Sequence, residues 1–342
     1  MTSTTHKGPM IVAEISGNHN GSLDRALEIV RAVAAAGAHA VKIQTYTADT
    51  ITLDVDTPAF RISAGHELWG SRTLHELYQE AYTPWEWHQP IFDLARELGL
   101  IAFSTPFDET AVDFLESLDV PLYKIASLEI VDLPLIKQVA ETGKPMILSV
   151  GTGSISEVAD AVEAARSGGA TDITLLACTS SYPALPNDAN LLRMPTMAAL
   201  FDVKVGLSDH TMGIGVSVAA AALGATVIEK HVTLRRADGG VDSAFSLEPE
   251  ELKQLVDECD AAVRALGSAS EWASSAENES LRLRPSLYIS ADVKAGDVAT
   301  HQNVRSVRPA GGLPPVEIDR VIGRTFGTDA PLGTPVNWEL LS

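Results

Sequence analysis

The chain has little of what marks disulfide-stapled or membrane-spanning proteins. It has only two cysteines in 342 residues, Cys178 and Cys259, and neither forms a CxxC motif. This excludes a disulfide framework and fits a reducing compartment. No apolar run reaches the roughly 18 residues that a membrane helix needs, and the first residues lack the charged and apolar blocks of a signal peptide. We therefore expect a cytoplasmic protein.

Positive charge is also scarce. Lysine and arginine number 25 against 45 aspartates and glutamates, which gives a formal net charge of -20. Such a balance argues against nucleic acid or an anionic membrane as a partner. Any site for an anion must therefore be built from individually placed basic residues. The composition is otherwise ordinary, and the length allows one large domain and a smaller one.

Apolar runs alternate with helix-like segments over most of the chain. Strands are predicted at 10–16, 40–46, 100–105, 122–126, 145–150, 173–178, 203–207 and 226–232. Helix-like segments lie between them, such as 22–36, which has Ser22 at its start and Gly37 just beyond its end. Eight such repeats favour an α/β fold with a closed (β/α)₈ TIM barrel. An open doubly wound sheet is the alternative, less favoured because no GxGxxG follows the first strand.

The pattern changes near residue 267. We predict a barrel domain at 1–267, a linker at 268–284 and a small β-rich domain at 285–342, where glycines give turn signals. A domain of that size is marginal alone, so it should rest on the barrel or on a partner subunit. The segment 47–83 is too long for an ordinary βα loop and is expected to form part of a substrate lid or an inter-subunit surface.

Polar residues occupy one parity of the predicted strands. In a barrel, alternate residues point inward, and those near the carboxyl ends surround the active site. If the two strand-end histidines point inward, the same parity includes Glu14, Lys42, Gln44, Lys124, Ser208, His210, Glu229 and His231. Charged residues inside apolar strands are costly unless they are paired or functional. The alternative is a buried salt-bridge network, for example Glu14 with Lys42.

Two kinds of site are indicated at these strand ends. His210 and His231 end consecutive strands, which tend to be neighbours, and neutral imidazoles suit a divalent metal. Lys42 and Lys124 predict a pocket for a phosphorylated or doubly anionic substrate. Hydroxyl groups at the same level come from Thr105, Ser127, Ser149 and Ser208. A lysine there could instead form a Schiff base, but the histidines favour a metal that polarises a carbonyl.

Six segments, in chain order, resemble the sialic acid synthase family. They are 13–21 (AEISGNHNG), 41–46 (VKIQTY), 103–108 (FSTPFD), 123–127 (YKIAS), 206–211 (GLSDHT) and 229–231 (EKH). Segments 285–288 and 304–309 resemble the C-terminal antifreeze-like (SAF) domain of that family. Within the family, 46–50, 83–88 and 239–249 are most similar to the branch that makes pseudaminic acid.

The resemblance implies a metal-dependent condensation. Phosphoenolpyruvate would join an open-chain amino sugar to give a nine-carbon 2-keto sugar acid and phosphate. For the pseudaminic branch, the sugar is 2,4-diacetamido-2,4,6-trideoxy-L-altrose, whereas legionaminic and N-acetylneuraminic acid synthases are same-chemistry alternatives. A metal-dependent hydrolase and a non-catalytic sugar-binding protein are the alternatives from other classes.

The resemblance also implies residue roles. His210 and His231 match the metal ligands, with Mn²⁺ expected and Mg²⁺ or Co²⁺ as alternatives. Catalytic roles fall on Glu14, Glu229 and Tyr182. Substrate contacts fall on Lys42, Gln44, Thr105, Lys124, Ser127, Ser149, Ser180, Ser208, Asp242 and Arg308. Arg308 would reach the sugar from the antifreeze-like domain of a second subunit, in a domain-swapped homodimer.

Two segments depart from the N-acetylneuraminate pattern. Ser180 stands where those synthases commonly carry an asparagine, and 240–243 reads Gly-Val-Asp-Ser instead of a Gly-Pro-Asp-His type. Both segments lie on the sugar side in the resemblance. They argue against N-acetylmannosamine as the sugar while leaving the phosphoenolpyruvate chemistry intact.

Overall fold

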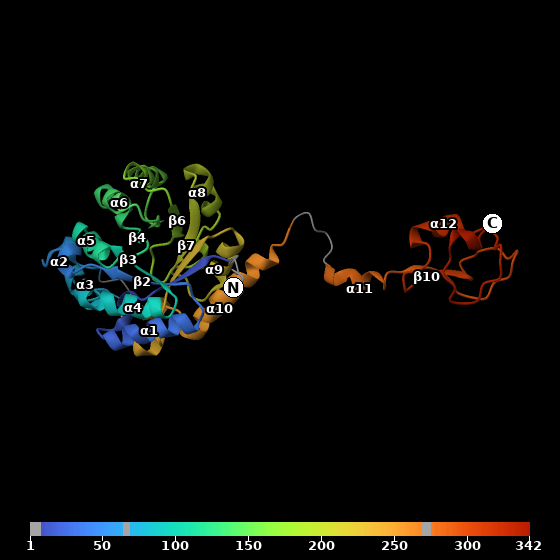
Figure 1. Cartoon of the computed structure of the whole chain (residues 1–342), viewed down its shortest axis with the longest axis horizontal. Coiled ribbons are helices and arrows are strands. Elements are labelled where there is room, and N and C mark those ends of the chain that lie inside the picture. Colours follow the sequence, from blue (N-terminus) through green and yellow to red (C-terminus); the bar gives the residue numbers. More distant parts are fainter. Residues whose placement is uncertain (1–7, 64–68, 269–274) are drawn as a thin grey trace. The chain divides into compact units, whose positions relative to one another are not determined.

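The computed structural model describes residues 8–63, 69–268 and 275–342. The chain divides into two compact units, Met1–Leu266 and Gly267–Ser342 (Figure 1). Part of the predicted linker, 269–274, lies outside the described residues. The rest of that segment includes a 3₁₀ turn, Ser275–Glu277, and the short helix α11, Asn278–Leu281.

The larger unit is a closed barrel of parallel strands (Figure 1). The strands are β1 (Met10–Glu14), β2 (Ala40–Thr45), β3 (Ile101–Pro106), β4 (Tyr123–Ile125), β5 (Met146–Ser149), β6 (Ile173–Cys178), β7 (Lys204–Asp209) and β8 (Val227–His231). Each strand pairs with the next, and β8 pairs with β1 to close the ring. The predicted TIM barrel is confirmed, and the open sheet is excluded.

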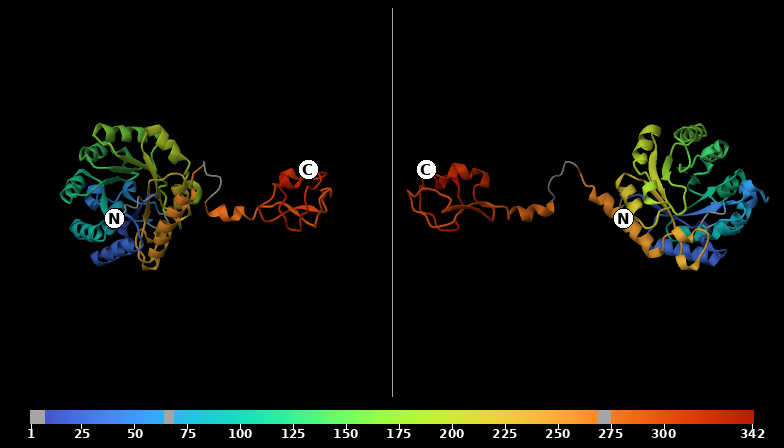
Figure 2. Two further views of the ribbon diagram at one scale, coloured as in Figure 1. Left: turned by 45° about the vertical axis from the view of Figure 1, so that its right-hand side comes forward. Right: turned by 180° about the vertical axis from the view of Figure 1, so that it is seen from behind.

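Helices surround this barrel (Figures 1 and 2). They are α1 (Leu23–Ala35), α4 (His88–Glu97), α5 (Glu109–Ser117), α6 (Leu133–Glu141), α7 (Ile155–Ser167), α8 (Arg193–Phe201), α9 (Gly215–Ala222) and α10 (Pro249–Ala265). Ser22 caps α1 by accepting a hydrogen bond from the Arg25 amide, as its sequence predicted. The long segment 47–83 contains two helices that were not predicted, α2 (Ala48–Ile51) and α3 (Leu74–Ala81); its residues 64–68 lie outside the described part.

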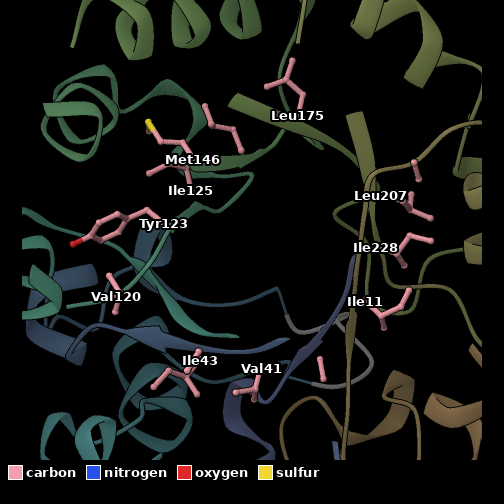
Figure 3. Close-up of a cluster of buried hydrophobic side chains, with 14 of the residues drawn as sticks. Ile11, Val41, Ile43, Val120, Tyr123, Ile125, Met146, Leu175, Leu207 and Ile228 are labelled. Carbon is pink, nitrogen blue, oxygen red and sulfur yellow. The ribbon is translucent and has the colours of Figure 1, made fainter. Parts of the chain in front are cut away.

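The two faces of each strand pack against different parts of the barrel unit. One parity, including Val41, Leu207 and Ile228, packs in the layer between strands and helices (Figure 3). The opposite parity includes a cluster inside the barrel, made of Val12, Ala40, Phe103, Leu122, Ile147, Leu176 and Val227. A side chain at Gly206 would collide with the Val227 carbonyl and the Leu176 side chain, so only glycine fits there. The barrel is therefore a packed core beneath its polar layer.

The smaller unit is β-rich and has its own hydrophobic core. Strands β9 (Ser286–Ile289) and β10 (Val304–Val307) pair antiparallel, and a short helix, α12 (Ile318–Val321), follows. The core includes Leu287, Ile289, Val304, Val321, Phe326 and Val336.

Throughout 8–63, 69–268 and 275–342, the helices are too short or too polar to cross a bilayer.

Candidate active site

The inward polar residues meet at the carboxyl ends of the strands. The strand register pairs Glu14 with Lys42 on one side and with His231 on the other, and it pairs Ser208 with Glu229. All five side chains are buried. The barrel therefore gathers residues that are more than 200 positions apart in the chain into one layer above the apolar floor.

Two lysines and two carboxylates form a buried charge cluster. The Lys42 ammonium pairs with the Glu14 carboxylate and lies 3.8 Å from Glu229 Oε2, while Lys124 Nζ lies 3.5 Å from Glu229 Oε1. Lys42 also donates to Thr105 Oγ1 at 3.0 Å. The salt-bridge network considered from the sequence is therefore present. Its formal charges cancel, so an entering anion must compete with Glu14 and Glu229 for the lysines.

The pKa values of the cluster follow from its burial. Burial lowers the pKa of Lys42 to about 7; the neighbouring Lys124 lowers it further and Glu229 opposes the fall. Burial pushes the pKa of Glu229 up, but Lys124 and Lys42 outweigh burial and hold it below its usual value. At neutral pH the Lys42 amine is therefore close to its titration midpoint.

The two predicted metal ligands face each other beside this cluster. The rings of His210 and His231 have centroids 5.4 Å apart. His210 Nδ1 donates to the Thr179 carbonyl at 3.0 Å, so in the neutral ring the lone pair lies on Nε2. His231 Nδ1 is buried without a hydrogen-bond partner among the described residues, and it lies 4.0 Å from Asp242 Oδ2. In the described ranges, no three or more His, Cys, Asp or Glu side chains form a preassembled metal cage.

Hydroxyl groups lie at or just beyond the carboxyl ends of β4 to β6. Ser127 Oγ and Ser180 Oγ share a hydrogen bond of 2.6 Å. Ser149 Oγ is buried and has no hydrogen-bond partner within the described part of the chain, so its hydroxyl can turn to a ligand. Gln44 is half-buried and lies next to Thr105 in the strand register. Most of the predicted substrate residues of the barrel thus lie at or just beyond strand ends, whereas Asp242 precedes the 3₁₀ turn Ser243–Phe245.

Aromatic rings wall the side of the histidines. The Tyr182 ring centroid lies 4.4 Å from that of His210 and 5.4 Å from that of Phe245. Trp69, from the long loop after β2, lies 5.6 Å from Tyr182, and its indole donates to the Val241 carbonyl at 2.9 Å. Burial raises the pKa of Tyr182 far above its usual value, so its phenol stays protonated.

One buried carboxyl near the cluster was not predicted from the sequence. Glu129 lies two residues after Ser127 in a 3₁₀ turn, Glu129–Val131. Its Oε2 is buried without a hydrogen-bond partner in the described ranges. Burial raises its pKa to about 7, with Lys124 among the groups that oppose the rise. The signal in the sequence was an acid just past a strand end, but the alternation rule for strands does not reach a 3₁₀ turn.

Arg308 belongs to the other compact unit of the chain. It follows β10 in the smaller unit and its side chain is exposed. Its predicted role therefore stays a prediction.

Comparison with known protein families assigns both units. The family model described as NeuB family matches residues 29–271. The chain belongs to the NeuB family. The SAF domain model matches residues 284–342. The predicted resemblance to the sialic acid synthase family, with its antifreeze-like domain, is thus confirmed.

Several known proteins are similar to most of the chain. The pseudaminic acid synthase of Helicobacter pylori is 42% identical over 330 residues, 96% of each chain. The N,N'-diacetyllegionaminic acid synthase of Campylobacter jejuni is 34% identical over 322 residues, 93% of this chain and 96% of that one. The crystal structure of the N-acetylneuraminic acid synthetase from Leptospira borgpetersenii in complex with citrate is 31% identical, with a TM-score of 0.71 over 80% of this chain and 91% of that one. The expectation of a synthase-type enzyme, a transferase, is confirmed.

Proposed function

We propose that the chain is a pseudaminic acid synthase. It would condense phosphoenolpyruvate with 2,4-diacetamido-2,4,6-trideoxy-L-altrose, giving a nine-carbon 2-keto sugar acid and phosphate. One observation carries the chemistry: two buried lysines and two buried histidines face the same barrel mouth in a NeuB family chain. The higher identity to pseudaminic acid synthases than to the legionaminic relatives supports the choice of sugar.

The lysine side would hold phosphoenolpyruvate. Lys42 and Lys124 supply positive charge where water is excluded, so their attraction for a phosphate or carboxylate is strong. Ser127, Ser149 and Thr105 add hydroxyl donors. Because the ligand would displace Glu14 from Lys42, binding would also free the Glu14 carboxylate for chemistry.

The histidine side fits a divalent ion, for which we propose Mn²⁺ with Mg²⁺ or Co²⁺ as alternatives. The fit rests on three groups: Nε2 of His210, Nδ1 of His231, and the Asp242 carboxylate nearby. Among the described residues, the buried Nδ1 of His231 has no hydrogen-bond partner. Waters and substrate oxygens would have to complete the coordination. When bound, such an ion polarises the sugar aldehyde.

The remaining steps use the chain's own groups. The methylene carbon of phosphoenolpyruvate attacks the aldehyde carbon, and the carbon that bears the phosphate becomes cationic. The Glu14 carboxylate stabilises that centre and activates the water that adds there, after which the C–O bond to phosphate breaks. The two protons of that water end on the former aldehyde oxygen, which becomes a hydroxyl group, and on the leaving phosphate; Glu129, with a pKa of about 7, can carry one of them. Glu229 holds Lys124 and Lys42 in place. The Tyr182 phenol, which stays protonated, would donate a hydrogen bond to the substrate.

Three aromatic side chains, here called the aromatic wall, favour a deoxy sugar with acetamido groups as the substrate. Trp69, Tyr182 and Phe245 offer apolar faces next to the histidines. Methyl groups of a 6-deoxy, doubly acetylated sugar would bury against them, whereas the C6 hydroxyl of N-acetylmannosamine would lose water there. Ser180 leaves room where an asparagine is common in N-acetylneuraminate synthases.

We also propose a domain-swapped homodimer. Several large apolar side chains are exposed on the segments that follow β4 to β7: Leu128, Val131, Ile155, Leu185, Leu192 and Met212. Exposed apolar side chains on neighbouring segments favour a covered surface. The smaller unit of a second copy would cover it and bring Arg308 to the sugar.

Complementation tests this dimer. Lys124→Met and Arg308→Ala should each be inactive alone, but co-expressed chains should recover about a quarter of the activity, because half of the dimers are mixed and each has one intact site. No recovery would exclude a site shared between subunits.

The central experiment is a substrate panel. Phosphate release should require phosphoenolpyruvate and Mn²⁺, stop with a chelator, and be fastest with the trideoxy-altrose. Equal rates with N-acetylmannosamine or the legionaminic precursor would overturn the sugar assignment. Turnover without phosphoenolpyruvate would favour the hydrolase, and full binding without turnover would favour a sugar-binding protein. A cytoplasmic location stays a prediction.

A further inference from the structure

A second buried ion pair lies one residue away from both histidines. Asp209 precedes His210 and Lys230 precedes His231, and the register of β7 and β8 places Asp209 directly beside Lys230. Asp209 Oδ2 and Lys230 Nζ are 3.0 Å apart, with side-chain exposures of 1% and 0%. Because successive strand residues point to opposite faces, the histidines face the mouth and this pair faces the helix layer.

The pair is bonded to several elements at once. Asp209 Oδ1 accepts hydrogen bonds from the Thr211 amide at 2.9 Å and the Thr211 hydroxyl at 2.7 Å. Asp209 Oδ2 accepts one from the Ser217 hydroxyl at 2.5 Å, and Lys230 Nζ donates to the Thr211 carbonyl at 2.6 Å. These contacts join β7, the loop after it, α9 and β8. His210 lies between Asp209 and Thr211, so its backbone is held on both sides.

Stability alone does not explain an ion pair at this place. Most of this parity of the strands carries apolar residues such as Ile15, Ile43 and Leu207, all within the hydrophobic core, and the buried polar pair Thr45 and Ser104 is uncharged. Two charges are costly to bury there, and apolar side chains of similar volume often stabilise a core as well or better. What the pair adds is a fixed distance between two neighbouring strand ends.

His231 depends most on that fixed distance. Its Nδ1 has no hydrogen-bond partner within the described ranges, so the backbone of β8 positions the ring, together with the contact to Phe245 at 5.0 Å between centroids. We propose that Asp209 and Lys230 are positioning residues that set the spacing of His210 and His231, and thereby the affinity of the site for a divalent cation. This inference rests on the proposed function of the histidines.

The test measures binding of Mn²⁺ alone to the metal-free, full-length chain by electron paramagnetic resonance of the free ion. Asp209→Asn combined with Lys230→Met removes the charged pair without leaving a buried charge unpaired. We expect Mn²⁺ affinity to fall about 10- to 100-fold, the usual effect of losing groups that orient metal ligands. Ser217→Ala, which removes one hydrogen bond to Asp209, should shift affinity in the same direction by a smaller factor.

A matched control lies at the other end of β7. Lys204 pairs with Asp172 at 2.9 Å, with side-chain exposures of 57% and 43%. Lys204→Met breaks that pair and should leave Mn²⁺ affinity unchanged. Phosphoenolpyruvate affinity without metal should stay within about twofold in all variants, since Lys42 and Lys124 bind through charge on other strands.

The outcomes separate this inference from the proposed metal site. If the unaltered chain binds no Mn²⁺, the metal site and the positioning role both fail. If the unaltered chain binds Mn²⁺ and both the double variant and Ser217→Ala bind it equally well, only the positioning role fails. A parallel loss of Mn²⁺ and phosphoenolpyruvate affinity also overturns it, because that pattern means general loosening of the barrel.

Discussion

Binding of phosphoenolpyruvate should weaken as pH rises through neutrality, because Lys42 loses its charge there. Its amine is buried, and burial lowers its pKa to about 7, with Lys124 contributing. The anion binds the protonated amine. Affinity is therefore complete below the pKa and falls above it, by about tenfold per pH unit.

The size of the effect follows from the titration curve. Between pH 7 and pH 8.5 the protonated fraction of a group with a pKa of about 7 falls from about one half to about 3%, so the dissociation constant should rise about 16-fold. Arginine keeps its charge over this range. Lys42→Arg should therefore flatten the profile, with some loss of affinity at pH 7 from the altered shape.

Calorimetric titration with phosphoenolpyruvate, without metal or sugar, measures this directly at pH 6.5 to 8.5. The control is Lys253→Arg, because Lys253 is an exposed lysine on α10; it should keep the slope of the unaltered chain. Glu129 also has a pKa of about 7, and its ionisation would weaken anion binding in the same range. If the slope persists in Lys42→Arg but disappears in Glu129→Gln, the assignment to Lys42 is wrong.

Three further changes test other parts of the structure. Gly206→Ala should lower the free energy of unfolding, measured by urea denaturation, by about 1–3 kcal/mol, because the added methyl group overpacks the barrel interior. The control is Gly215→Ala, where nothing lies within 4 Å of the new methyl group; it should not lower the free energy of unfolding. Trp69→Ala should reduce the preference in kcat/KM for the trideoxy sugar over N-acetylmannosamine about tenfold, as expected for lost apolar contacts, and an unchanged ratio in the substrate panel would argue against the aromatic wall. Glu129→Gln should lower kcat about 100-fold or more, because a proton donor is lost, while phosphoenolpyruvate still binds at pH 7. A change in KM alone would instead assign Glu129 to substrate binding.

The barrel and its inward polar layer were accessible from sequence because both depend on local periodicity. Charged residues such as Lys42 and Glu14 stand out in short apolar strands, and the period of two assigns them to the same face as His231. Eight repeats of strand and helix then favour one ring. These rules need only neighbouring residues, which a single sequence provides.

The rest depends on contacts that no local rule predicts. Trp69 meets the Val241 carbonyl across 172 positions of the chain, and neither residue lies in a regular element. Glu129 lies in a 3₁₀ turn, where strand parity has no meaning. Asp209 and Lys230 carried a signal, two charges on the parity opposite to the histidines, but the sequence does not say that their strand ends pair in register.

The burial of Lys42 and Lys124 also shapes how fast a substrate arrives. Seen from a distance, the chain is a polyanion of net charge -20, and its two pocket cations are already neutralised by Glu14 and Glu229. A trianionic substrate is therefore repelled until it comes within roughly 10 Å, the screening length at moderate salt. Added salt should accelerate encounter, in contrast to enzymes with an open basic funnel. Selectivity for the substrate would then depend on a slow dissociation rate of the bound complex and not on a fast association rate.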